Sequence, residues 1–315
     1  MAALIRSNEV QSHHCQLDDR GECEVLRWNI AIIILLLPTS PAYTADKVFR
    51  DLNTALFDEI KRGRSREALE LLEQGAKLES RDRFGNTPLL LAARTSRYKL
   101  VQELIEQGAN INHQNLIGST AILRAATANR TRNVVILMEA GAEFNLRNNK
   151  GLTPLAAAAF NGDEDSFQLL LAKGANPDVW DNSQKTAIVY AAAKGFVSIV
   201  ESLLGTGINI NQRYGNDLTV LMWSAGYSND VPPVDAGKMI RLLLDHEAEL
   251  DLQDNRGWSA MMIAANMGHS NAVDILIKAG ADIHVEAGDG QTAAKLARAS
   301  GHLDTLALLN AVGAN

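Results

Sequence analysis

The chain has few of the residues that stabilise a fold without a large packed core. Its only two cysteines, Cys15 and Cys23, lie near the start of the 315 residues, so the main body has no disulfide framework and no cysteine-based metal site. Basic residues are not in excess, since 30 Lys and Arg stand against 37 Asp and Glu for a net charge of -7. A nucleic-acid-binding protein would need a basic patch. We therefore expect a fold held by packing alone and no nucleic-acid partner.

The short motifs of catalytic sites are also missing from the sequence. It has no Gly-rich phosphate loop, no paired histidines at metal spacing and no nucleophile elbow. The acidic run Asp163-Glu164-Asp165 is explained by the start of a helix, whose dipole favours negative charge. We interpret five scattered histidines as structural: His113, His246, His269, His284 and His302. The sequence predicts a protein that is not an enzyme and holds no cofactor or metal.

An apolar run near the amino terminus, Trp28–Leu37, has ten residues, which is too short for the roughly 20 that span a bilayer. Arg27 precedes the run, and Ser40-Pro41-Ala42 follows it with the small-x-small pattern of a signal-peptidase site, with Ala45 as a second candidate. We interpret residues 1–45 as a targeting segment and expect a protein without a stable membrane span, exported to the periplasm or secreted. Two alternatives stay open: the run packs on the end of the fold, or it is a short membrane anchor.

The stretch before this run departs from a signal peptide, because it is long and acidic where a short basic region is typical. It contains Glu9, Asp18, Asp19, Glu22 and Glu24. We hypothesise that translation starts near Val25 or Leu26. In the alternative interpretation the run is not cleaved, and the protein is a cytoplasmic or host-directed adaptor.

A repeat of 33 residues runs through the rest of the chain. A hydroxyl residue recurs at this step, with one interval of 40, at Thr54, Thr87, Thr120, Thr153, Thr186, Thr219, Ser259 and Thr292. A second series has the same step and the same long interval: Gly75, Gly108, Gly141, Gly174, Gly207, Glu247, Gly280 and Gly313. Two markers in phase define eight repeats, and periods of this length indicate a stacked array.

Within each repeat the pattern predicts two helices. A pair of small residues, such as Ala92-Ala93, follows the hydroxyl residue by five positions and lets neighbouring helices approach closely. Farther along, apolar residues recur at i, i+3 and i+4, as in Val101, Leu104 and Ile105, which is one face of a helix. The terminal glycine suits the left-handed residue that commonly ends a helix. Each unit therefore reads as a turn, a short helix and a second helix.

These motifs resemble ankyrin repeats, most clearly in Gly85-Asn86-Thr87-Pro88-Leu89 and Gly151-Leu152-Thr153-Pro154-Leu155. The resemblance implies an all-α solenoid of about eight helix-turn-helix units with projecting β-hairpin loops, and a role in binding other proteins. We assign residues 46–315 to this domain, with units of about 48–80, 81–113, 114–146, 147–179, 180–212, 213–252, 253–285 and 286–315. Some units depart from the pattern, because Gln184 and Asp217 replace the turn glycine and Glu247 replaces the closing glycine. We expect unit 6 to be the least regular.

The resemblance also implies a partner-binding surface along the loop tips and the ends of the first helices. It comprises the positions four, three and one before each hydroxyl residue and seven and eight after it. Its charged residues in units 2 to 7 are all basic: Arg83, Arg94, Lys150, Lys185, Lys194 and Arg256. Its apolar residues are Phe84, Leu116, Ile117, Leu152, Phe160, Leu218, Tyr227, Trp258 and Met267.

We predict that the six basic residues contact a partner protein together with Phe84, Phe160, Tyr227, Trp258 and Met267, since aromatic residues and arginine dominate interface energetics. The partner would carry acidic and apolar groups, and the protein itself would be monomeric. Leu116, Leu152 and Leu218 are equally well explained by packing between neighbouring loops. Tyr190 and Trp223 occupy a position normally filled by core leucine, so we expect them in the core.

Seven extra residues in unit 6 fall in the stretch Tyr227–Gly237, between its two helices, and we expect them to form a loop. A contact with the partner and a neutral surface loop are equally good interpretations. Asp230 and Asp235 in this stretch are the only support for an enzymatic alternative. The sequence predicts neither the identity of the partner nor the cellular process.

Overall fold

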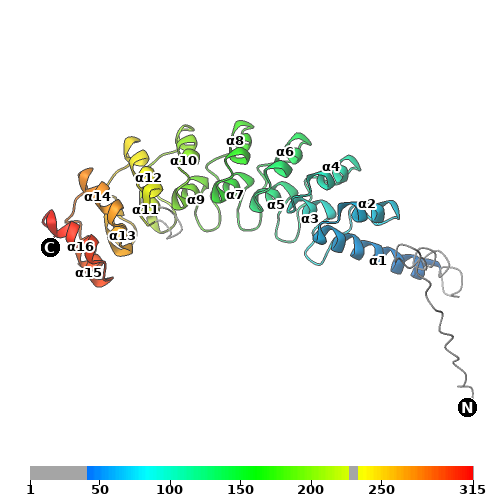
Figure 1. Ribbon diagram of the computed structural model, residues 1–315, viewed down its shortest axis with the longest axis horizontal. Coiled ribbons are helices and arrows are strands. Elements are labelled where there is room, and N and C mark those ends of the chain that lie inside the picture. The colour runs from blue at the N-terminus through cyan, green and yellow to red at the C-terminus, as the bar shows by residue number, and fades with distance from the viewer. Residues whose placement is uncertain (1–40, 227–232, 315) are drawn as a thin grey trace, which may run out of the picture. The chain divides into compact units, whose positions relative to one another are not determined.

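The structure is a computed structural model that describes residues 41–226 and 233–314 (Figure 1). Residues 1–50 and 51–315 form two separate parts of the chain. The described residues of the first part are the beginning of helix α1 (Pro41–Arg62). The second part contains the rest of α1 and the other described helices, which are arranged in pairs. The apolar run Trp28–Leu37 and Tyr227 lie outside the described residues.

The described residues form sixteen α-helices and no strand, so the all-α prediction is confirmed. The first helices of the pairs are α1, α3 (Pro88–Ala93), α5 (Ala121–Thr127), α7 (Pro154–Asn161), α9 (Ala187–Lys194), α11 (Val220–Ala225), α13 (Ala260–Met267) and α15 (Ala293–Ala299). The second helices are α2 (Ser65–Glu73), α4 (Tyr98–Glu106), α6 (Thr131–Glu139), α8 (Glu164–Ala172), α10 (Val197–Leu204), α12 (Pro233–Asp245), α14 (Ser270–Lys278) and α16 (Leu303–Ala311). A short 3₁₀ turn, η3 (Gly215–Asp217), precedes α11.

The recurring hydroxyl residue begins the first helix in most units. The side chain of Thr87, for example, accepts a hydrogen bond from the backbone N–H of Leu90. Equivalent caps occur at Thr120, Thr153, Thr219, Ser259 and Thr292. Each such cap stabilises the helix by about 1 kcal/mol. Thr186 has the same extended backbone but its side chain makes no capping bond.

Unit 1 differs from this pattern. Thr54 lies inside the 22-residue helix α1, so no turn precedes a short first helix there. The reason is local, because neither glycine nor proline occurs between Ala42 and Arg62 to end a helix that begins earlier. Our expectation of a turn at the start of this unit was wrong.

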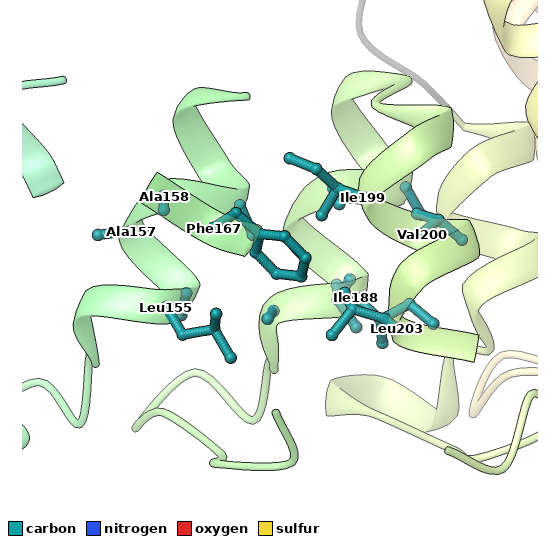
Figure 2. Close-up of a cluster of buried hydrophobic side chains, with 14 of the residues drawn as sticks. Leu155, Ala157, Ala158, Phe167, Ile188, Ile199, Val200 and Leu203 are labelled. Carbon is teal, nitrogen blue, oxygen red and sulfur yellow. The ribbon is translucent and has the colours of Figure 1, made fainter. Parts of the chain in front are cut away.

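The core runs along the array between neighbouring pairs. From α3 onward successive first helices pack on one another, and from α2 onward successive second helices do the same. Figure 2 shows one segment of this core, where Phe167 of α8 lies among Leu155 of α7, Ile188 of α9 and Ile199 of α10. The small pairs expected at close contacts, such as Ala92-Ala93, are fully buried. Burying a side chain such as Phe167 stabilises the fold by about 2–3 kcal/mol.

The residue that ends each second helix has a left-handed backbone, as predicted. This holds for Glu247, with φ of 64°, as well as for glycines such as Gly174 with φ of 88°. At the turn-glycine position Gln184 (56°) and Asp217 (61°) are also left-handed. This conformation costs a non-glycine residue about 1–2 kcal/mol. The three replacements therefore keep the backbone of the repeat at an energetic cost.

The projecting loops are tight turns rather than the β-hairpins expected. Within residues 41–226 and 233–314 the pairing is limited to an isolated bridge between Tyr214 and Leu218. A short carboxylate or amide organises each turn; Asp82 Oδ1, for example, accepts from the N–H groups of Phe84 (2.8 Å) and Asn86 (2.9 Å). Since the turn closes within five residues, there is no length for a ladder.

The extra residues of unit 6 do not all form a loop. In other units the second helix begins 11 residues after the capping position, as Tyr98 follows Thr87. With seven extra residues the equivalent start is Gly237, yet α12 begins at Pro233. Proline is tolerated in the first turn of a helix. The loop prediction is thus wrong for Pro233–Gly237, which extends α12 by about one turn.

Candidate partner-binding surface

The side chains on the exposed side of the first helices meet in pairs between units. In each pair, one residue stands seven positions after the capping residue of its unit. It faces the residue that stands four positions after the capping residue of the following unit. The rings of Phe160 and Tyr190 make such a contact edge to face, with centroids 5.6 Å apart. A Cβ added at Gly226 would lie 2.9 Å from Cγ2 of Ile263, which occupies the same relation. We call these inter-unit pairs, and from unit 2 onward they are Arg94/Arg124, Thr127/Ala157, Phe160/Tyr190, Ala193/Trp223, Gly226/Ile263 and Asn266/Leu296.

A pocket of about 280 Å³ opens where the inter-unit pair is small. Thr127 and Ala157 form this pair, and their short side chains leave space between α5 and α7. The pocket is lined by Thr127, Leu152, Ala157, Phe160, Asn161 and Tyr190. Its walls are mainly apolar, and its size suits one large side chain. We call it the apolar pocket.

Aromatic and basic side chains continue from this pocket across α7, α9 and α11. Lys194 Nζ lies 5.8 Å from the ring centroid of Phe160, and Lys185 Nζ lies 4.5 Å from that of Trp223 and 5.8 Å from that of Tyr190. Phe160 is 47% exposed. We call Phe160, Lys185, Tyr190, Lys194 and Trp223 the central patch. It presents positive charge beside aromatic edges, the chemistry that suits an acidic and apolar ligand.

Tyr190 is fixed in this patch by a hydrogen bond. Its hydroxyl donates to Oδ2 of Asp181, whose other oxygen accepts from the N–H groups of Ser183 and Lys185. Burial, together with this bond to Asp181, raises the pKa of Tyr190 well above its usual value. The ring is therefore held neutral and oriented toward the pocket.

A second arginine–aromatic site lies in unit 7. The guanidinium of Arg256 lies 4.1 Å from the ring centroid of Trp258 and donates to Oδ2 of Asp254 at 2.9 Å and 2.6 Å. The Asp254 side chain is fully buried and also accepts from the backbone of both neighbours. The charge of Arg256 thus has a partner within the protein.

Large apolar side chains are exposed at the tips of the first two projecting turns. Phe84 is 54% exposed beneath Arg83, whose guanidinium lies 4.7 Å from the ring centroid, and Leu116 and Ile117 are 70% and 54% exposed. Leu116 lies against the preceding turn, since a Cβ added at Gly85 would be 3.1 Å from its Cγ, but most of its side chain is exposed. Leu152 and Leu218 are half-buried against the core.

The structure brings together three of the eleven predicted contact residues in the central patch: Phe160, Lys185 and Lys194. Arg83 with Phe84 and Arg256 with Trp258 form separate local pairs. Lys150 is exposed at a turn tip, and Met267 is 43% exposed at the end of α13. Arg94 ends α3 and belongs to the first inter-unit pair. Tyr227 lies outside the described residues, so its contribution stays a prediction.

Sequence reasoning missed Arg124 and undervalued Tyr190. Arg124, Tyr190 and Trp223 all stand four positions after the capping threonine, where other units have Leu91, Ala157, Ile263 and Leu296. Both aromatic residues pack against the core, as expected, but Tyr190 also lines the apolar pocket. The signal was a charged or polar aromatic residue at a position that is aliphatic in the other units from unit 2 onward.

Other polar groups have structural roles. Ring nitrogens of His113, His269 and His302 hydrogen-bond to the backbone carbonyls of Gly85, Ala225 and Asn266. Asp163 caps α8 by accepting from the N–H of Ser166. In the part of the chain that the structure describes, no cluster of three His, Cys, Asp or Glu residues could hold a metal ion. None of the described helices is both long and apolar enough to cross a membrane.

Comparison with known proteins identifies the repeat. The family model described as ankyrin repeats (3 copies) matches residues 27–115, 56–148, 118–214, 209–287 and 234–315. The crystal structure of the human ASB11 ankyrin repeat domain is similar in fold, with a TM-score of 0.64 and 24% sequence identity. The similarity covers 71% of this chain and 98% of that one.

Proposed function

Because the chain belongs to the ankyrin-repeat family, whose repeats act as protein–protein interaction modules, we propose that it is a non-catalytic scaffold for a partner protein. The partner segment carries acidic and apolar groups and lies across the first helices of units 3 to 6. The observation that carries this proposal is the apolar pocket beside the central patch. There Phe160 is 47% exposed and Lys185 and Lys194 lie over aromatic rings. Binding pockets in general combine an apolar wall with a few placed polar groups.

The charge balance supports an acidic partner. The protein has a net charge of -7, yet in units 2 to 7 every charged side chain that the sequence assigned to this surface is basic. A basic surface attracts acidic segments, whereas the net charge of -7 that every copy carries disfavours association between copies. We accordingly propose that the scaffold is a monomer.

The test is affinity capture with the full chain as bait, followed by mass spectrometry of the bound proteins. We expect the double variant Phe160→Ala, Lys194→Ala to lose the principal partner while retaining the circular dichroism and melting temperature of the parent. Leu303→Ala is the matched control, because Leu303 is 72% exposed on α16 and lies outside the surface. Capture of the same partner by parent and double variant would refute the proposed surface.

We further propose that the protein is exported and that its partner is an envelope or secreted protein. Support comes from Arg27, the apolar run Trp28–Leu37 and the small-residue pattern at Ser40-Pro41-Ala42. Intact-mass measurement of the native protein tests this, and we expect a chain that begins at Tyr43. A native protein that keeps residues 28–37 would favour the cytoplasmic or host-directed adaptor instead.

A further inference from the structure

Two arginines meet in the first inter-unit pair. Arg94 is the exposed C-cap of α3, and Arg124 lies partly buried in the middle of α5. The Nε of Arg124 is buried and has no hydrogen-bond partner. No ion pair in the described part of the chain includes either guanidinium. Two positive charges therefore lie near each other, and neither has an ion-pair partner in the described part of the chain.

The carboxylate of Asp82 acts to raise the pKa of Arg124, but it makes no ion pair with either arginine among the described residues. Asp82 accepts hydrogen bonds from Phe84 N–H, from Asn86 N–H and from the Asn86 side-chain amide. Burial acts to raise the pKa of Asp82, but these bonds outweigh it and hold the pKa below its usual value. Asp82 is thus occupied by its own turn.

Two other arginines show how a guanidinium finds a partner within this fold. Arg130 donates from Nε to the carbonyl of Arg94, and Arg256 is paired with Asp254. Buried arginines in proteins are nearly always paired or hydrogen-bonded. Burial, and after it the charge of Arg94, lowers the pKa of Arg124. A ligand with an oxygen acceptor would supply the hydrogen bond that the Nε of Arg124 lacks.

We infer that Arg94 and Arg124 form a binding site for a carboxylate of the partner, and that the apolar pocket takes an aromatic or aliphatic side chain of the same segment. This inference rests on the proposed function and deepens it. Arginine matches the two oxygens of a carboxylate with parallel donors. Thr127 lines the pocket and lies one helical turn beyond Arg124, so the two sites adjoin on one face of α5.

The repeat geometry sets the spacing between the two groups of the partner. Neighbouring helices pack about 10 Å apart, and an extended chain advances about 3.3 Å per residue. The distance from one unit to the next therefore corresponds to about three residues of an extended partner segment. We expect an acidic residue three or four positions from the apolar anchor, with the acid toward unit 2 and the anchor toward unit 5.

The first experiment tests the anion site without a partner. The Nε–Hε signals of the full chain are followed by NMR during titration with N-acetylglutamate and, separately, with inorganic phosphate. We expect a saturable shift of the Arg124 signal with N-acetylglutamate. The absence of a shift with either anion would overturn the inference, and so would tenfold tighter binding of phosphate, which would indicate a phosphorylated ligand instead.

The second experiment tests the spacing. Fluorescein-labelled Gly/Ser peptides carry one Glu and one Phe separated by one to eight residues, and binding to the full chain is measured by polarisation. Affinity should be highest when Phe is the third or fourth residue from Glu. Arg124→Gln should weaken this peptide about tenfold but leave its Glu→Gln counterpart unchanged. Arg298→Gln, an exposed arginine of α15, is the control and should bind normally.

Two outcomes separate this inference from the proposed function. If Arg124→Gln weakens the Glu and Gln peptides equally, the arginine site is wrong although the apolar pocket still binds. We also expect Arg124→Gln to raise the melting temperature of the free protein, because it removes a repulsive and poorly solvated charge. A lowered melting temperature would show that Arg124 is a structural residue and would overturn the inference.

Discussion

Two arginine sites lie toward opposite ends of the same row of helices and differ in whether the arginine has an ion-pair partner. In unit 7, Arg256 stacks on Trp258 and is neutralised by the buried carboxylate of Asp254. In units 2 and 3, Arg94 and Arg124 lie near each other and form no ion pair with a carboxylate among the described residues. In the sequence Arg94 and Arg256 look alike, as basic residues at surface positions of the repeat, and Arg124 was not assigned to the surface.

The comparison teaches that a partner within the protein, rather than the residue type, decides whether an arginine stabilises the fold or binds a ligand. A paired arginine contributes to the fold and has less to offer a ligand. An unpaired one costs the fold stability and keeps its full attraction for an anion. We therefore expect substitutions near unit 7 to change stability and substitutions near units 2 and 3 to change binding.

The largest effect is expected at the turn carboxylates. Asp254→Ala should lower the free energy of unfolding by about 3 kcal/mol, because two backbone N–H groups lose their acceptor at a buried site and the guanidinium of Arg256 loses its partner. Asp82→Ala should cost about 1.5 kcal/mol, since Asp82 is partly exposed and water can replace it. Urea denaturation measures both values. Equal losses would contradict the distinction between the two sites.

A smaller effect is expected on acidification, again on the unit 7 side. Burial, and after it the charge of His302, lowers the pKa of His269 below its usual 6.5. The folded protein then holds this ring neutral, so stability is complete above pH 6.5 and falls as the pH decreases below that value. We expect the free energy of unfolding to decrease between pH 7.5 and 5.5. His269→Gln should abolish this loss, whereas the exposed His284→Gln should keep it.

The smallest effect is expected at the left-handed residues that replace glycine. Glu247→Gly should raise the free energy of unfolding by about 0.5 kcal/mol, since glycine removes the steric cost of φ 64° but loses more chain entropy on folding. Thermal denaturation would detect the gain. Peptide binding at the apolar pocket should not change, and a change would mean that unit 6 is coupled to the surface of units 3 to 5.

The fold was largely predictable because each element depends on local residues. Thr87 caps a helix, Gly174 ends one and Ala92-Ala93 sets a packing distance, all within one unit. Prediction failed where local signals were absent or ambiguous. The 33-residue phase suggested a turn at Thr54, but no helix-breaking residue accompanies it.

The candidate site was less predictable because it depends on contacts between units. Arg124 is a single basic residue in the sequence, and only the packing of α5 against α3 reveals that it faces another arginine. The apolar pocket also depends on a contact between units, because the side chains of Thr127 and Ala157 are both too small to fill the space between α5 and α7. The repeat positions predicted which basic residues lie on the surface. They did not predict which of these residues form an ion pair within the protein.

The inter-unit pairs have a consequence for how such a protein changes partners during evolution. Duplication of one 33-residue unit between Arg124 and the apolar pocket would insert one more pair and lengthen their separation by about 10 Å. The same two groups of a ligand would then need about three more residues between them. Gain or loss of whole units would thus select ligands by length while every contacting side chain stayed the same.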